Sequence, residues 1–313
     1  MTNFNTPSKV SIIILNWNGK NDTLECLKSL QELSYPNYEI IVVDNASSND
    51  SVDKLSKIPH IELRCNTQNF GFAGGNNKAI TSSVEAGADY IWILNNDATV
   101  STDCLEKLVL VAQKDPKIGL LSPVLYEKEP HNKIQHCNTH VELSIPHIKE
   151  ANDIATAEQW QIESPGGIIV WGTALFIPKH TIETIGLLDE HFFAYAEDTD
   201  YSLRSIKAGL KNVTVFDASV WHQGHTGHRS PHYYYYVVRN SFYFWKKHLS
   251  LLKYLKICRW NLHQTKKQIT ALKGHEQQVS ACLLGLWDGF RCIGGEYNPQ
   301  RKAPWFMKLL FEK

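Results

Sequence analysis

The sequence has no excess charge of either sign. Its 313 residues include 32 lysines and arginines against 32 aspartates and glutamates, which gives a formal net charge of +0. Proteins that bind nucleic acid over a broad surface usually carry a basic excess. We therefore expect no nucleic-acid partner, and only local patches could attract another polyanion.

Long apolar runs and paired cysteines are also missing. No stretch is apolar over the roughly 20 residues that span a bilayer, and residues 1–9 lack the apolar core of a signal peptide. The seven cysteines include no Cys-x-x-Cys pair, which favours reduced thiols over a disulfide framework or a zinc cluster. We expect a cytoplasmic protein of ordinary globular composition, with 43% hydrophobic residues.

The sequence does contain an alternation of short β-rich runs and amphipathic segments. Strand followed by helix, repeated in this rhythm, predicts right-handed βαβ units on a parallel sheet. The expected elements of the first third are strands over 10–15, 39–43 and 61–64, a helix capped by Asn21 or Asp22 and ended by Pro36, and a helix over 51–58.

A glycine-rich segment, residues 69–77 (NFGFAGGNN), precedes a helical pattern that runs to Ala86. Glycines let the backbone approach a ligand closely, and free N–H groups at a helix start favour phosphate. The segment is neither a Walker loop nor a Gly-x-Gly-x-x-Gly fingerprint. The residues alone leave a phosphate-binding loop and a flexible turn both open.

Residues 90–97 (YIWILNND) form an apolar run that stops at two amides and a carboxylate. Such a run is typical of a central strand in a covered parallel sheet, and these sheets bind ligands beyond the carboxyl ends of their strands. A carboxylate with no base partner beside it favours a hydrated divalent cation over acid–base catalysis. Asp97 is therefore a candidate metal ligand, with a plain strand-to-turn junction as the alternative.

The second half of the chain contains a polar segment and an acidic cluster. A helix over 102–113 precedes residues 127–165, which we interpret as an irregular insertion or lid, and strands over 166–171 and 174–178 then form the acceptor side. Residues 197–200 (EDTD) begin a helix, where the helix dipole stabilises acidic side chains. The aromatic residues before them favour a partly dry cleft, in which one carboxylate could take a proton from a hydroxyl.

Histidines and then basic residues are concentrated in the last third. Residues 221–232 include four histidines, which could be metal ligands or ordinary loop residues, with His222 and His225 as the candidates. A tyrosine-rich helix is expected over 232–248. Beyond it, lysines and arginines alternate with leucines and aromatics, a pattern typical of peripheral contact with an anionic membrane or of packed helices with a solvated basic face.

The order of these motifs resembles glycosyltransferase family 2, the inverting enzymes of GT-A fold, and within it the rhamnosyltransferase-like members. The resemblance extends over residues 10–248. The segments that carry it are residues 10–18, 41–47, 69–77, 94–97 and 196–200, Gly172 with the strand after it, and His222.

The resemblance implies an α/β fold of GT-A type, a mixed, mostly parallel sheet flanked by helices. A Rossmann-like nucleotide-binding half (8–126), an insertion or lid (127–165) and an acceptor-binding and catalytic half (166–248) would make up a glycosyltransferase domain over 1–248. Residues 249–313 would form a basic, helical C-terminal extension.

The resemblance also implies residue roles. Asp198 matches the catalytic base, and Glu197 is its neighbour in the Glu-Asp pair. Asp97 matches the last carboxylate of the Asp-x-Asp motif and would bind Mg²⁺ or Mn²⁺ on the diphosphate, with His222 as a further ligand. Asn95 replaces the first carboxylate, which lowers the charge of the site. The implied nucleotide-sugar contacts are Asn16, Asn18, Asp44, Asn45, Phe70, Gly71, Gly75, Asn76, Asn96 and Asp97, and the implied acceptor contacts are Trp171, Gly172 and Arg239.

The implied reaction moves a sugar, with rhamnose among the candidates, from a dTDP- or UDP-sugar to a saccharide or lipid-linked saccharide in surface polysaccharide synthesis. Asp198 would take the proton of the acceptor hydroxyl as that oxygen attacks the anomeric carbon opposite the leaving diphosphate. Two alternatives remain. One is a sugar-phosphate nucleotidyltransferase, although its usual Arg- and Lys-containing loop after the first strand is absent, and the other is a non-catalytic nucleotide- or saccharide-binding module.

Overall fold

The computed structural model describes residues 7–130, 132–142, 147–223, 229–309 and 311. The chain divides into two compact units, one of residues 1–188 and 201–224 and the other of residues 189–200 and 225–313. This division groups the tyrosine-rich helix with the C-terminal helices, whereas the sequence was divided at residue 248. The functional limits expected from the sequence, 1–248 and 249–313, stay a prediction.

The first unit alternates strands and helices, as predicted. Its main strands are β1 (Val10–Asn16), β2 (Tyr38–Asp44), β3 (Glu62–Cys65), β4 (Tyr90–Asn95), β5 (Ala98–Val100), β6 (Ile118–Glu127), β7 (Ile134–His136), β11 (Ala174–Pro178) and β12 (Lys211–His222). Its helices are α1 (Lys20–Leu30), α2 (Ser51–Leu55), α3 (Gly71–Glu85), α4 (Cys104–Ala112), α5 (Ile154–Glu163) and α6 (Lys179–Ile185), together with the later part of α7 (Glu197–Lys207).

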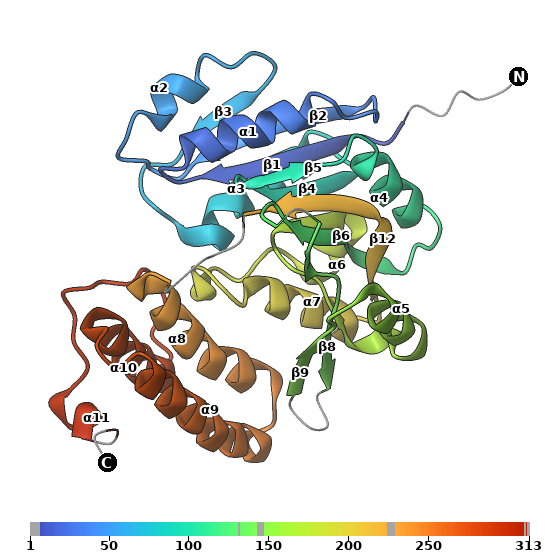
Figure 1. The fold of residues 1–313 in the computed structure, drawn as a ribbon. Coiled ribbons are helices and arrows are strands. Elements are labelled where there is room, and N and C mark those ends of the chain that lie inside the picture. Colours follow the sequence, from blue (N-terminus) through green and yellow to red (C-terminus); the bar gives the residue numbers. More distant parts are fainter. Residues whose placement is uncertain (1–6, 131, 143–146, 224–228, 310, 312–313) are drawn as a thin grey trace, which may run out of the picture. The chain divides into compact units, whose positions relative to one another are not determined.

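Within the described residues these strands form one nine-stranded sheet in the order β3-β2-β1-β4-β11-β6-β12-β5, with β7 beside β6 (Figure 1). The pairs among β1, β2, β3 and β4 and the pair of β6 with β12 are parallel, whereas β11, β5 and β7 run antiparallel to their neighbours. This is the mixed, mostly parallel sheet that the sequence predicts.

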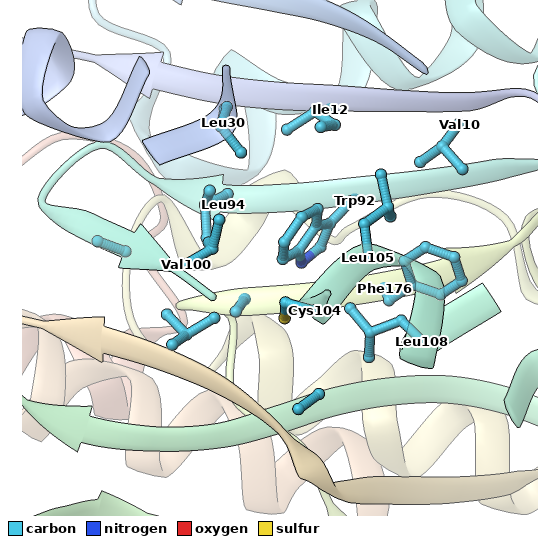
Figure 2. Packing of buried hydrophobic residues seen from close by; sticks show 14 of the residues in the cluster. Val10, Ile12, Leu30, Trp92, Leu94, Val100, Cys104, Leu105, Leu108 and Phe176 are labelled. Atoms are coloured by element: carbon cyan, nitrogen blue, oxygen red, sulfur yellow. The ribbon is translucent and has the colours of Figure 1, made fainter. Parts of the chain in front are cut away.

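Both faces of the central strands are buried, which explains their continuous apolar runs. Successive side chains of a strand point to opposite faces. On one face Trp92 and Leu94 of β4 lie with Leu105 and Leu108 of α4 (Figure 2). The alternate residues of the same strands, Ile13, Ile91 and Ile93 among them, pack on the other face with Ala79 and Ile80 of α3.

The prediction of irregular structure over 127–165 is wrong for the described residues, whereas the role of this segment as an insertion or lid stays a prediction. The described residues contain β7, β8 (Thr139–Glu142), β9 (His147–Glu150) and α5, and β10 (Ile168–Ile169) completes a small antiparallel sheet in the order β10-β8-β9. Three of the buried side chains in this region, His136, Asn138 and Thr139, are polar, and its buried apolar residues, Cys137, Val141, Ala151 and Ala157, follow one another at irregular intervals. So irregular a set gives no readable period along the sequence.

Two further differences concern single elements. Helix α1 begins at Lys20 with Gly19 as N-cap, two or three residues before the predicted caps Asn21 and Asp22. Strand β6 had no counterpart among the predicted elements, although its sequence is a long apolar run that pairs with β11 and β12. Helix boundaries and strands without flanking turn signals are the least readable features of a sequence.

The second unit consists mainly of helices, which are α8 (Pro231–His248), α9 (Leu251–Ala271), α10 (Glu276–Arg291) and α11 (Trp305–Leu309). Helix α8 confirms the predicted tyrosine-rich helix. Helices α8 and α10 approach so closely that a Cβ on Gly285 would lie 2.5 Å from the carbonyl oxygen of Tyr235. None of the helices in the described residues has the length and apolar character needed to cross a membrane.

Candidate functional site

The carboxyl ends of β1 and β2 bring two predicted residues together. The register pairs Asn16 with Asp44, and the Asn16 amide nitrogen donates to Asp44 Oδ2 at 2.7 Å. Ser47 adds its hydroxyl to Oδ2 at 2.7 Å and its backbone N–H to Oδ1 at 2.9 Å. A carboxylate has about four acceptor positions. With three of them occupied by these donors, the buried Asp44 is fixed in orientation and can still accept one N–H of a ligand on Oδ1.

The side chains of Asn18 and Asn45 hold the backbone around this edge of the sheet. Asn18 has a positive φ of 59°, and its side-chain oxygen accepts the backbone N–H of Ser48 at 2.8 Å. Asn45 donates to Asn69 Oδ1 at 2.8 Å and to the Gly71 carbonyl at 3.1 Å, and its own oxygen accepts the Phe70 N–H at 3.1 Å. The buried Asn45 therefore holds the chain at the start of α3.

The glycine-rich segment is a helix, so the prediction of a loop is wrong for most of its length. Helix α3 begins at Gly71, whose φ of +73° turns the chain after Phe70. Gly75 faces β1, where a Cβ would lie 2.6 Å from Leu15 Cδ1. These glycines therefore permit a sharp helix entry and close helix-to-strand packing. The Asn76 amide donates to the Phe72 carbonyl at 2.9 Å, within the same helix.

Asp97 and His222, both predicted as metal ligands, meet in the first unit. Pairing of β5 with β12 sets His222 opposite Ala98, which follows Asp97 directly. Asp97 Oδ1 lies 3.1 Å from His222 Nε2, and His222 Nδ1 lies 2.8 Å from Gln135 Oε1. Because Gln135 Oε1 can only accept, it fixes a proton on Nδ1 of His222 and leaves Nε2 facing Asp97.

This pair fits a divalent cation in part. Asp97 Oδ1 is buried and faces His222 Nε2, so a proton or a cation between these two atoms would satisfy both. Burial raises the pKa of the Asp97 carboxyl, but the hydrogen bond and charge of His222, aided by Lys128, outweigh burial and the net pKa is lowered. Over the described ranges, no cluster of three or more His, Cys, Asp or Glu side chains could hold a metal. A cation here would need further ligands from a diphosphate and water.

Thr23 links the Asn16–Asp44 pair to Asn96, the residue before Asp97. Its hydroxyl donates to Asn16 Oδ1 at 2.9 Å and lies 3.1 Å from the Asn96 amide nitrogen, which also donates to the Gly19 carbonyl at 3.2 Å. Asn96 therefore ties the end of β4 to the start of α1. Of the predicted donor-binding residues, Asn16, Asp44 and Asn96 are thus connected along one edge of the sheet.

The predicted acceptor residues Trp171 and Gly172 lie between β10 and β11. Trp171 stacks on His136 with ring centroids 4.0 Å apart, and burial lowers the pKa of His136 to about 3, so this imidazole is neutral. The next residue, Thr173, accepts the backbone N–H of Asn95 at 2.8 Å. This turn is thus fastened to the end of β4.

In the second unit, the segment before the Glu-Asp pair has unusual backbone geometry. Phe193, Tyr195 and Ala196 have φ values of 65°, 67° and 72°. Such conformations cost roughly 1–2 kcal/mol for each residue with a Cβ, and they persist only where surrounding contacts enforce them. A specific set of hydrogen bonds must therefore hold this segment.

Asn240 of α8 supplies those hydrogen bonds. Its amide nitrogen lies 3.1, 2.7 and 2.6 Å from the carbonyl oxygens of Phe192, Ala194 and Tyr195. Its oxygen accepts Arg239 Nε–H at 2.8 Å. One side chain thus fixes three carbonyls of the segment that leads into Glu197 and Asp198.

Arg239 holds backbone as well, which leaves the predicted acceptor contact without support. Its guanidinium donates to the carbonyls of Phe192 and Gly295 and lies 4.9 Å from the ring centroid of Tyr236. The side chain is 1% exposed. These contacts direct the Arg239 donors to the backbone of its own unit, and its predicted contact with an acceptor stays a prediction.

The acidic cluster at the start of α7 separates into three environments. Burial, followed by the charge of Asp198, raises the pKa of Glu197 well above its ordinary value. Asp198 Oδ1 accepts the Thr199 N–H at 2.6 Å. Asp200 is buried beside Lys247 Nζ at 2.8 Å and His248 Nε2 at 2.7 Å.

Several residues that shape these sites had not been predicted. Ser47 ends the segment 41–47, which carries the family resemblance, and Asn240 follows Arg239 in the tyrosine-rich helix. Their positions were therefore weak indications of a role. Gln135 is in the segment taken as irregular, and Thr23 is within a helix, so no pattern identified them. His225, the alternative to His222, lies outside the described residues.

Known sequences match this chain along most of its length. Residues 11–179 match the model of glycosyl transferase family 2. The dTDP-rhamnosyl transferase RfbF of Shigella flexneri is 26% identical over 306 residues, 93% of this chain and 99% of that protein. The N-acetylglucosaminyl-diphospho-decaprenol L-rhamnosyltransferase of Mycobacterium tuberculosis is 24% identical over 213 residues, 61% of this chain and 69% of that protein.

Solved structures show the same fold. The mannosyltransferase PcManGT of Pyrobaculum calidifontis, solved with GDP-Man and Mn²⁺, has a TM-score of 0.57 at 17% identity over 78% of this chain and 64% of that chain, less than two thirds of its length. TarS 1–349 of S. aureus with UDP-GlcNAc has a TM-score of 0.55 at 15% identity over 91% of this chain and 81% of that chain. The fold is GT-A, as the sequence predicts. Since the family model spans more than half of its residues, the chain belongs to glycosyl transferase family 2 and is a rhamnosyltransferase-like glycosyltransferase.

Proposed function

We propose that this glycosyltransferase moves a sugar, with rhamnose as the leading candidate, from a dTDP- or UDP-sugar to a saccharide or lipid-linked saccharide in surface polysaccharide synthesis. The observation that carries the proposal is the polar edge of the sheet, where Asp44 with Asn16 and Asp97 with His222 are joined through Thr23 and Asn96. The names of the relatives, a dTDP-rhamnosyl transferase and a decaprenol-linked rhamnosyltransferase, support this donor and acceptor class.

Donor binding uses the first unit. Asp44 Oδ1 accepts an N–H of the pyrimidine ring or a ribose hydroxyl, while Ser47 and Asn16 keep the carboxylate in place. Uracil and thymine both present an N–H that suits one acceptor. The ring methyl that distinguishes thymine from uracil would need an additional apolar contact.

The diphosphate binds near Asp97 and His222. A divalent cation such as Mn²⁺ or Mg²⁺, when bound there, neutralises charge that collects on the departing nucleotide. Asp97 and His222 would hold the cation through a carboxylate oxygen and an imidazole nitrogen, and Gln135 keeps the imidazole in the required tautomer. With only one carboxylate, we expect the site to bind the cation together with the nucleotide rather than before it.

The base of the proposed reaction is Asp198 in the second unit. A carboxylate can act as general base when it lies within hydrogen-bond reach of the acceptor hydroxyl. Asn240 and Arg239 hold the segment before it, and the hydrogen bond from Thr199 orients its Oδ1. The attack inverts the anomeric centre in one displacement.

The test is a transfer assay with dTDP-rhamnose and a set of UDP-sugars, preceded by a thermal-shift screen with Mn²⁺ or Mg²⁺. A donor at 100 times its dissociation constant should stabilise the protein by about 2.7 kcal/mol. Asp198→Asn should lower transfer by about 10²- to 10⁴-fold while donor binding is kept. The exposed Asp217→Asn is the matched control, and undiminished transfer by Asp198→Asn would exclude that residue as the base.

Titration calorimetry tests the cation separately. Nucleotide affinity should rise with Mn²⁺ for the natural chain, and Asp97→Asn and His222→Gln should each remove most of that gain. Equal affinity in chelator and in Mn²⁺ would contradict a metal role for this pair.

A further inference from the structure

The neutral net charge of the chain hides a separation along the sequence. Residues 249–313 contain eleven lysines and arginines against four acidic residues, whereas residues 1–248 contain 21 against 28. The C-terminal 65 residues therefore carry a net charge of about +7, and the rest of the chain about −7. A basic region of this density attracts an anionic partner at short range.

Helix α9 shows this asymmetry most strongly. Its 21 residues include five lysines and arginines and not one acidic residue. Tyr254, Ile257, Cys258 and Thr265, spaced three, four and seven residues apart, are buried and form its inner face. In Figure 1, α9 lies alongside α8 and α10, which accounts for the burial of that face.

The opposite face of α9 mixes large apolar side chains with the basic ones. Leu252 is 77% exposed, Leu255 is 56% exposed, and Lys256 and Arg259 beside them are also exposed. Residues separated by three, four and seven positions share one side of a helix, so these four form a continuous patch. The patch is extended by Leu251, at 70% exposure, and Trp260, at 50%.

This combination matches the composition of helices that lie in a membrane interface. Such helices insert leucine and tryptophan at the boundary of the acyl chains, while lysine and arginine reach anionic headgroups. A helix face that contacts only water is mainly polar and does not collect several exposed leucines. The complete absence of acidic residues from α9 gives it charge complementarity to an anionic surface over its whole length.

We propose that the outer face of α9, defined by Leu251, Leu252, Leu255, Lys256, Arg259 and Trp260, docks on an anionic lipid bilayer without crossing it. The contact is independent of the glycosyl-transfer chemistry, because these residues take no part in the donor or base sites. It would keep the enzyme at a surface where lipid-linked acceptors are concentrated.

The experiment is co-sedimentation with vesicles of phosphatidylcholine alone or with about one third phosphatidylglycerol. Each basic side chain near an anionic surface strengthens binding by about fivefold. The double variant Lys256→Gln/Arg259→Gln should therefore bind anionic vesicles about 25-fold more weakly than the natural chain. Leu252→Ser/Leu255→Ser should weaken binding by at least about tenfold through the apolar term. Raising the salt concentration should weaken binding further.

The matched control is Lys28→Gln/Lys114→Gln, which removes the same charge from exposed lysines of α1 and of the residues after α4. This control should retain binding within about twofold, because its lysines are not on the docking face. Equal loss in control and α9 variants, failure of the natural chain to bind anionic vesicles at low salt, or equal binding to neutral vesicles would each overturn the proposal. Preference for a polyanionic RNA such as poly(U) over anionic vesicles would also overturn it.

Activity separates this proposal from the proposed function. Both α9 variants should keep normal turnover with a soluble acceptor, and circular dichroism should confirm their fold. Normal turnover without vesicle binding by the natural chain would reject docking alone, whereas vesicle binding without turnover on any nucleotide-sugar would reject only the proposed reaction.

Discussion

The donor edge of the first unit and the segment before Asp198 in the second unit are built in different ways. At the donor edge, Asn16 and Asp44 are brought together by the register of two adjacent parallel strands. The segment over 192–196 instead adopts strained backbone conformations that Asn240, more than 40 residues later, must hold. The first arrangement follows from regular secondary structure, whereas the second depends on one side chain in a distant helix.

The largest effect should come from breaking the second arrangement. Asn240→Asp replaces an amide donor by oxygens that face three carbonyls, which repel them. We expect a loss of about 1–3 kcal/mol or more in the free energy of unfolding, and about a tenfold to hundredfold loss in kcat as Asp198 shifts. Thermal unfolding and steady-state kinetics measure the two effects.

The matched control for that change is Asn212→Asp in the first unit. The buried Asn212 amide also donates to two carbonyls, those of Ile168 and Ser202, both at 2.9 Å. This variant should lose similar stability but keep kcat among its folded molecules. If both variants lose kcat equally, Asn240 has only a structural role.

A smaller loss of stability should distinguish the helix-to-helix packing of the second unit from the helix-to-strand packing of the first. Gly285→Ala sets a Cβ 2.5 Å from a backbone oxygen of α8, so the helices must move apart, at about 1–3 kcal/mol. In Gly75→Ala the nearest atom is the end of the flexible Leu15 side chain, so the loss should be smaller. Gly166→Ala, with open space around its Cβ, serves as control. Equal denaturation midpoints for Gly285→Ala and Gly166→Ala would contradict this account.

The smallest expected effect concerns pH. Burial raises the pKa of Glu197, so the folded state favours the protonated form. The stability that this group contributes is present below its unfolded pKa of about 4.3 and is lost as pH rises through the folded pKa. Glu197→Gln should therefore raise the melting temperature at neutral pH, with a difference that shrinks towards pH 4.

Melting temperatures between pH 4 and pH 9 provide the measurement. The exposed Glu158→Gln on α5 should leave the profile unchanged. A Glu197→Gln difference that stays constant with pH would show that the burial of Glu197 is unrelated to its ionisation. Asp97 offers a contrast in the first unit, since its carboxyl pKa is lowered by His222 despite burial.

Much of the first unit could be predicted because its signals are local. The apolar runs of β1, β2 and β4 and the polar residues after them indicated both the sheet and the edge where ligands bind. The glycine-rich segment was misread as a loop because glycines also serve close packing, as Gly75 does against Leu15. The small sheet within 127–165 was missed because several of its buried side chains are polar and its buried apolar residues are irregularly spaced.

By itself, the sequence determined the family, the first strands and helices of the sheet, and the position of Asp44 and Asp97 at the ends of strands, since these depend on residue type and spacing. Only the tertiary structure decided that Gln135 orients His222, that Arg239 faces backbone carbonyls, and that Asn240 holds the segment before Asp198. Those contacts join residues 45 to 87 positions apart, and no local pattern specifies which distant side chain will satisfy a buried polar group.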